Sequence, residues 1–223
     1  MPFVMTHLII ARNLSEIYAE QIKDIPQFYL GSAAPDAVHN RANYRSDYKK
    51  ASHLCVGDER WGYVTNNDEW EASIIAFMND RIKSADRDFI LGYCAHTLAD
   101  LYNNVRSWTP FRFKYPDEAA KGYDNSHHRE SELVDIELGL TYPGREDFRR
   151  LLMASRSVDL PDIVFAEEID KQRDLILNNW YVDKKHPDIS RNMHVTRDNM
   201  NELIEGATGY IVRIFNTAIG EGN

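Results

Sequence analysis

The sequence predicts an all-α protein, a compact multi-helix bundle, and three observations support this fold class. Apolar residues recur at three- and four-residue spacing along much of the 223-residue chain, which is the period of a helix with one buried face. Apolar and polar residues never alternate over six positions between turn signals, so strand signals are scarce. Hydrophobic residues make up 43% and charged residues 27%, which excludes a disordered or low-complexity chain.

Five segments carry the helical pattern. They cover residues 3–23, 67–83, 87–105, 159–180 and 196–219. The third segment is the richest in apolar residues, so we expect a central, mostly buried helix there. Pro161 suits the first turn of the fourth segment, and Thr196 suits the N-cap of the fifth.

Loops are expected where glycine, proline and asparagine gather. These stretches are 31–36, 57–67, 107–124 and 181–195. A chain of this length can bury one sizeable core, and it shows no internal repeat. We therefore expect one domain over residues 1–223.

Charge and composition limit the classes of partner and the cellular location that we expect. The net charge is −9, and a protein that binds duplex nucleic acid normally presents a basic face, so that partner is disfavoured. The sequence has no apolar run of about 18 residues, so no transmembrane segment is expected. Two cysteines make no disulfide framework, and the start does not read as a signal peptide, which together predict a cytoplasmic location. The oligomeric state is not readable from the sequence.

Two histidine–carboxylate pairs with a four-residue spacing are the most informative chemical feature. His96 and Asp100 lie in the apolar third segment, and His128 and Glu132 repeat the spacing further along. Side chains four apart share one helix face, so each pair can chelate a divalent cation. Taken alone, the first pair also fits a local hydrogen bond in a polar seam. The second also fits a solvated helix start.

Three further residues are candidates with ordinary alternatives. Asp36 follows Pro35 in a stretch of small residues that lets a ligand approach closely, although it also suits a helix N-cap. His53 is either a ligand or a lone surface histidine. His7 has apolar neighbours on both sides, which is also typical of a satisfied core histidine.

Together these residues resemble a known family. The order is His7, Gly-Ser-Ala-Ala-Pro-Asp36, Ser-His53, Phe-Ile-Leu-Gly-Tyr-Cys-Ala-His96-Thr-Leu-Ala-Asp100 and His128-x-x-x-Glu132. Over about residues 3–135 this order is similar to the bacterial zinc-dependent phospholipase C family, which is related to the single-strand-specific zinc nucleases. That family is all-α and holds up to three zinc ions in a cleft where it hydrolyses phosphodiesters.

The resemblance implies a set of metal ligands. One metal is held by Asp36, His53, His96 and Asp100, and Asp100 bridges to a second metal that His7 also binds. The pair His128 and Glu132 holds a third. The resemblance also implies that Asp36 is the general base for the attacking water.

Two departures from the family pattern affect the second and third sites. The secreted members use a free N-terminal amine beside the first histidine, whereas six residues precede His7 here. They also carry a histidine where this chain has Arg106, so the third site keeps only His128 and Glu132. We expect Arg106 to contact a substrate phosphate through its planar guanidinium, or else to form a salt bridge at a helix end.

The predicted function is a metal-dependent phosphoesterase that hydrolyses a phosphodiester with a metal-activated water. The expected cofactor is Zn²⁺, with one to three divalent metals, and manganese, iron or nickel also suit these ligands. The expected partner is a small phosphoester or a phospholipid head-group substrate. The alternative is a non-catalytic helical binding or regulatory module that keeps part of the metal cluster. Trp61, Tyr63 and Trp70 either line the cleft or pack in the core.

Overall fold

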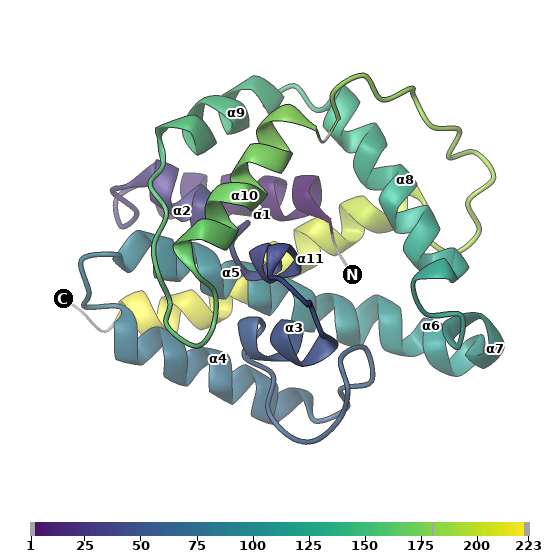
Figure 1. The fold of residues 1–223 in the computed structure, drawn as a ribbon, viewed down its shortest axis with the longest axis horizontal. Helices are drawn as coiled ribbons and strands as arrows, with labels where there is room; N and C mark the ends of the chain where they lie inside the picture. The colour runs from purple at the N-terminus through teal and green to yellow at the C-terminus, as the bar shows by residue number, and fades with distance from the viewer. Residues whose placement is uncertain (1–2, 180, 221–223) are drawn as a thin grey trace.

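The computed structural model describes residues 3–179 and 181–220, and within these ranges the protein is an all-α bundle, as predicted (Figure 1). The helices are α1 (Val4–Ile17), α2 (Ile25–Gly31), α3 (Ser46–Ser52), α4 (Asn67–Arg81), α5 (Arg87–Asn103), α6 (Thr109–Lys114), α7 (Pro116–Ala119), α8 (Ser126–Thr141), α9 (Arg145–Ala154), α10 (Ala166–Asn178) and α11 (Arg197–Gly220). Short 3-10 helices cover η1 (Pro35–Asn40) and η3 (Gly122–Asp124), and a π-helical turn covers Asn104–Trp108. In the described part of the chain, the one strand-like feature is an isolated bridge between Leu160 and Val164.

Several helices begin at residues that cap them. Asp24, Asn66 and Asn125 each accept a hydrogen bond from a backbone N–H three residues further on, at the starts of α2, α4 and α8. Thr196 does the same for α11 through its Oγ1, which accepts from the Asn199 N–H at 3.2 Å. The predicted N-cap of the last helix is therefore confirmed.

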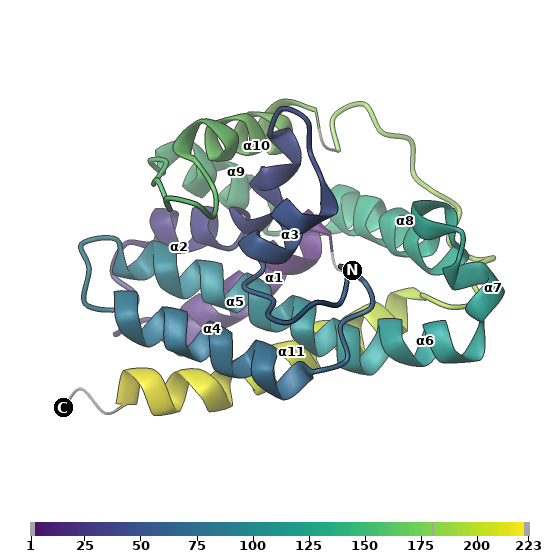
Figure 2. The same ribbon diagram turned by 60° about the horizontal axis from the view of Figure 1, so that its bottom comes forward.

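Helix α5 is the centre of the bundle, as its apolar composition predicted. Nearly all of its side chains are buried, and it contacts α1, α2, α4 and α11. Figure 2 shows α5 running between α2 and α4. Any polar side chain that α5 carries inward is therefore surrounded by protein.

Helices α2 and α5 make backbone contact through two glycines. A Cβ on Gly31 would lie 2.1 Å from the carbonyl oxygen of Phe89, and one on Gly92 would lie 1.9 Å from that of Phe28. Only glycine permits this approach. The contact brings the residue that follows α2, Ser32, against the turn of α5 that carries His96.

Two predicted helices are shorter than the sequence pattern indicated. Helix α1 ends at Ile17 rather than 23, yet Tyr18 and Ile22 stay buried in the turn that follows, so apolar spacing continued after the helix had ended. Helix α10 begins at Ala166 rather than 159. Pro161 lies in the turn closed by the bridge between residues 160 and 164, not in a helical first turn.

The loop predicted over 107–124 is wrong. That stretch holds part of the π-helical turn, then α6, α7 and η3. Pro110 and Pro116 lie in the first turns of α6 and α7, where a missing N–H removes no helical hydrogen bond. Prolines that we interpreted as loop markers are helix starts.

The structure also bears on the membrane prediction. Among the described residues, no helix combines the length and the apolar composition that crossing a bilayer requires.

Candidate metal centre

The centre is built around two side chains on α5. His96 and Asp100 lie one helical turn apart, and each is only 2% exposed. His96 Nδ1 lies 2.8 Å from the carbonyl oxygen of Ser32. A carbonyl only accepts, so Nδ1 carries the hydrogen and Nε2 presents its lone pair. The contact between α2 and α5 thus sets the orientation of this imidazole.

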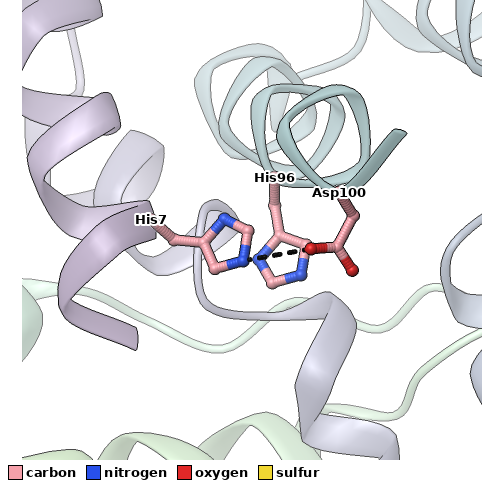
Figure 3. Close-up of side chains that lie close together, drawn as sticks. All are labelled: His7, His96 and Asp100. Carbon is pink, nitrogen blue, oxygen red and sulfur yellow. Dashed lines mark ion pairs between the residues drawn. The ribbon is translucent and has the colours of Figure 1, made fainter. Parts of the chain in front are cut away.

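Helix α1 adds His7, which is 3% exposed. Its ring stacks on His96 with centroids 3.6 Å apart and planes within 9°, and its Nε2 lies 3.5 Å from Asp100 Oδ1 (Figure 3). Both ring nitrogens of His7 and Asp100 Oδ1 are buried and make no hydrogen bond within the described residues. Buried polar atoms are nearly always satisfied, so a cation is a natural partner for His7 Nε2 and Asp100 Oδ1, which lie 3.5 Å apart.

His53 enters from the end of α3 and is fully buried. Its Nδ1 lies 3.0 Å from the Lys49 carbonyl oxygen, and its own carbonyl accepts from the Trp70 indole N–H at 2.7 Å. Its Nε2 lies 3.2 Å from His96 Nε2 and 3.2 Å from Asp100 Oδ2. Two imidazole nitrogens therefore face each other, while their Nδ1 atoms are both engaged by carbonyls.

Asp36, on η1, completes the cluster. Its Oδ1 lies 3.5 Å from His53 Nε2. The five side chains form two groups of three possible ligands, in each of which the ligand atoms lie within 4.8 Å of one another. The groups are His7, His96 and Asp100, and Asp36, His53 and His96.

These separations suit ligands of a bound divalent cation. Zinc binds imidazole nitrogen at about 2.0–2.1 Å in tetrahedral geometry, so neighbouring ligand atoms lie roughly 3.3 Å apart. The separations of 3.2–3.5 Å around His53 Nε2 and Asp100 match that value. The side chains present here can therefore hold a divalent metal.

Electrostatics keep Asp36, Asp100 and His96 in forms suited to a metal, whereas His53 favours its protonated form. Burial raises the pKa of Asp36 and Asp100, but nearby cationic and hydrogen-bonding groups outweigh it and hold both pKa values well below the usual range. Burial holds the pKa of His96 well below its usual value. For His53 burial also lowers the pKa, yet the two carboxylates outweigh it and raise the pKa overall. A metal that binds His53 would therefore displace a proton.

Sequence reasoning missed one member of the site, Lys49. It lies on α3, is 3% exposed, and places Nζ 2.8 Å from Asp36 Oδ1. Its four-residue spacing from His53 was the available signal, because side chains four apart lie on the same face of a helix.

A cavity of about 300 Å³ opens beside the cluster, with Asp100 in its wall. Trp61, Tyr63 and Trp70 line it. Trp70 is also 2% exposed and belongs to the core. All three aromatic residues therefore line the cleft, and Trp70 also packs in the core.

The pair predicted for a third metal lies apart from the two ligand groups. His128 is half-buried and lines the same cavity as Asp100, but Glu132 is exposed. The buried histidine of α8 is its neighbour His127, whose Nε2 lies 2.7 Å from Ser107 Oγ.

Arg106 is also placed away from the cluster. It is exposed, lies over the Tyr102 ring, and lines a second cavity of about 530 Å³. Asn103 and His127 border both cavities. The cavity that contains Asp100 does not include it.

Comparisons with known proteins add no evidence about the centre, so its assignment as a candidate metal site depends on its geometry. No protein-family model, no curated protein and no solved structure matches this chain. The all-helical fold and the buried histidine–aspartate groups are compatible with the family that the sequence resembles.

Proposed function

We propose that this chain is a metal-dependent phosphoesterase, with zinc as the metal, that hydrolyses a phosphodiester. The observation that supports this best is the convergence of three imidazoles and two carboxylates from four segments of the chain beside a cavity. The order of these residues resembles zinc-dependent phospholipase C. Histidine with carboxylate also suits manganese, iron or nickel.

The proposed ligands are Asp36, His53, His96 and Asp100, with His7 against Asp100. When bound, a divalent cation supplies Lewis acidity toward water and toward a phosphoryl oxygen. Asp36, which is partly accessible, orients the attacking water and accepts its proton. His128 and Glu132 are left out because Glu132 faces solvent.

The size of the cavity favours a substrate with a small group attached to the phosphate. Its volume of about 300 Å³ is at the lower end for ligand sites. A small phosphoester or a phospholipid head group fits this scale. Arg106 is left out of the proposed substrate contacts because it lines the second cavity.

The test combines metal content with hydrolysis. The purified chain is loaded with Zn²⁺, desalted and analysed by mass spectrometry for metal, then assayed with bis(p-nitrophenyl) phosphate and p-nitrophenyl phosphorylcholine. We expect bound zinc and turnover in the wild type, and loss of both in His96→Ala/Asp100→Ala. His186→Ala, at an exposed histidine, is the matched control and should retain both. Wild type without metal, or a double variant that keeps it, would defeat the proposal.

One observation favours the non-catalytic alternative. The Lys49 ammonium already contacts the Asp36 oxygen that lies nearest His53, which weakens that carboxylate as a base. Zinc bound by wild type without turnover on either ester would support a binding or regulatory module instead.

A further inference from the structure

One lysine, Lys49, is buried beside the cluster. Lysine is almost never fully buried unless it is paired, and Lys49 is paired at Asp36 Oδ1 at 2.8 Å. Its Nζ also lies 3.3 Å from His39 Nε2 and 5.2 Å from the Trp61 ring centre. The Lys49 ammonium is thus within hydrogen-bonding distance of the His39 ring, whose Nε2 can accept from it.

We propose that Lys49 is a built-in cation that limits this centre to one divalent metal ion; this rests on the proposed function. Asp36 and Asp100 carry two negative charges and Lys49 carries one positive charge, which leaves a net charge of −1 with neutral imidazoles. One divalent ion brings the total to +1, and two bring it to +3. A buried excess of three charges is strongly disfavoured.

The ligand geometry makes a second ion depend on Asp36. The two groups of possible ligands share His96. Its Nδ1 is engaged by the Ser32 carbonyl, so Nε2 is the single nitrogen that both groups can use. One nitrogen lone pair serves one metal. When His96 serves the group with His7 and Asp100, a second ion is left with Asp36 and His53, and the Lys49 ammonium occupies Asp36.

Lys49 also limits Asp36 as a ligand. Its ammonium, His53 and His39 all approach the same oxygen, Oδ1. A substitution that removes the positive charge releases this oxygen and lowers the net charge to −2. A second divalent ion then brings the total to +2 rather than +3.

The experiment counts zinc per chain by equilibrium dialysis and metal analysis, with His96→Ala/Asp100→Ala giving the background from surface sites. We expect one zinc in the wild type and two in Lys49→Met. Lys49→Gln, which keeps a polar end, is the second neutral variant in case Lys49→Met does not fold. Lys49→Arg keeps the charge and should stay at one.

The outcomes separate this inference from the proposed function. Two or more zinc ions in the wild type, or one zinc in both folded neutral variants, would overturn the inference and leave the proposed function intact. Wild type that binds no zinc above the background would defeat both.

Discussion

The same spacing of histidine and carboxylate occurs on α5 and on α8, with different results. On α5, His96 and Asp100 are buried and meet side chains from three other segments. On α8, His128 is half-buried and Glu132 is exposed, and neither belongs to a group of three ligands among the described residues. Spacing places two side chains on one helix face, but what faces that helix decides whether they form a site.

The neighbours of the two helices explain the difference. Helix α5 is packed against α1, α2, α4 and α11, so its polar face points into protein. Helix α8 contributes a different carboxylate to the fold, Asp135, which accepts from the backbone N–H groups of Met5 and Thr6 at the start of α1. That helix supports the centre by holding the start of the helix that carries His7.

The largest expected effect is the loss of zinc binding when the pair on α5 is removed, compared with removal of the pair on α8. His96→Ala/Asp100→Ala should lose zinc binding by at least about 100-fold, since two ligands are gone. His128→Ala/Glu132→Ala should change zinc affinity by less than about threefold. Isothermal titration with Zn²⁺ measures both. A loss of similar size in the two double variants would remove the distinction drawn between α5 and α8.

The next largest effect is expected when the close glycine contact between α5 and α2 is disrupted. Gly92→Ala should lower the free energy of unfolding by about 3 kcal/mol, because its Cβ would overlap the Phe28 carbonyl oxygen. It should also weaken zinc binding by displacing the Ser32 carbonyl from His96. Gly209→Ala is the control, since a Cβ there meets nothing within 4 Å, and it should stabilise helix α11 by roughly 0.5–1 kcal/mol. Urea unfolding measures both, and equal stability would contradict the close packing.

The cap that α8 provides to α1 predicts a smaller loss. Asp135 is 2% exposed, and its oxygens face Met5 N–H, Thr6 N–H and the Thr6 hydroxyl. Asp135→Asn turns an amide donor toward these donors and should cost about 1–3 kcal/mol of stability. Asp80→Asn, at an exposed position, should change stability by less than about 0.5 kcal/mol. Thermal unfolding of both variants measures these changes in stability, and equal stability of the two variants would contradict the prediction.

A further effect, comparable in size with that of Asp135→Asn, concerns acid sensitivity at His127 on α8. Burial lowers the pKa of His127 to about 3, below its ordinary value of about 6.5. Between these values the unfolded chain binds a proton that the folded chain does not, so stability falls as the pH drops below about 6.5. The contribution from pH 6.5 to pH 5 is about 2 kcal/mol.

Replacing His127 tests this dependence. His127 packs against Phe111 and Trp108, so His127→Phe suits the space and should lose less stability between pH 7 and pH 5 than the wild type. Urea unfolding at the two pH values measures it. His186→Phe, at an exposed histidine, should leave the acid dependence as it is in the wild type. An unchanged acid dependence in His127→Phe would show that other groups cause it.

Much of the fold was predictable because helical periodicity is local. The apolar stripe of α4, with Trp70, Ile74, Phe77 and Met78 buried, and the dense apolar composition of α5 were both readable from spacing. The ends of the helices were less readable. Buried Tyr18 and Ile22 extended the apparent period of α1 beyond its end, and prolines at helix starts resembled loop signals.

By itself, the sequence determined the all-α class, the burial of α5 and the pairing of His96 with Asp100 on one face, because each depends on residues within a few turns of one another. Only the tertiary structure decided that Lys49 lies against Asp36, that Glu132 faces solvent, and that Arg106 lines a separate cavity. These outcomes depend on which elements pack together, and helical spacing carries no information about a neighbour that is distant in the chain.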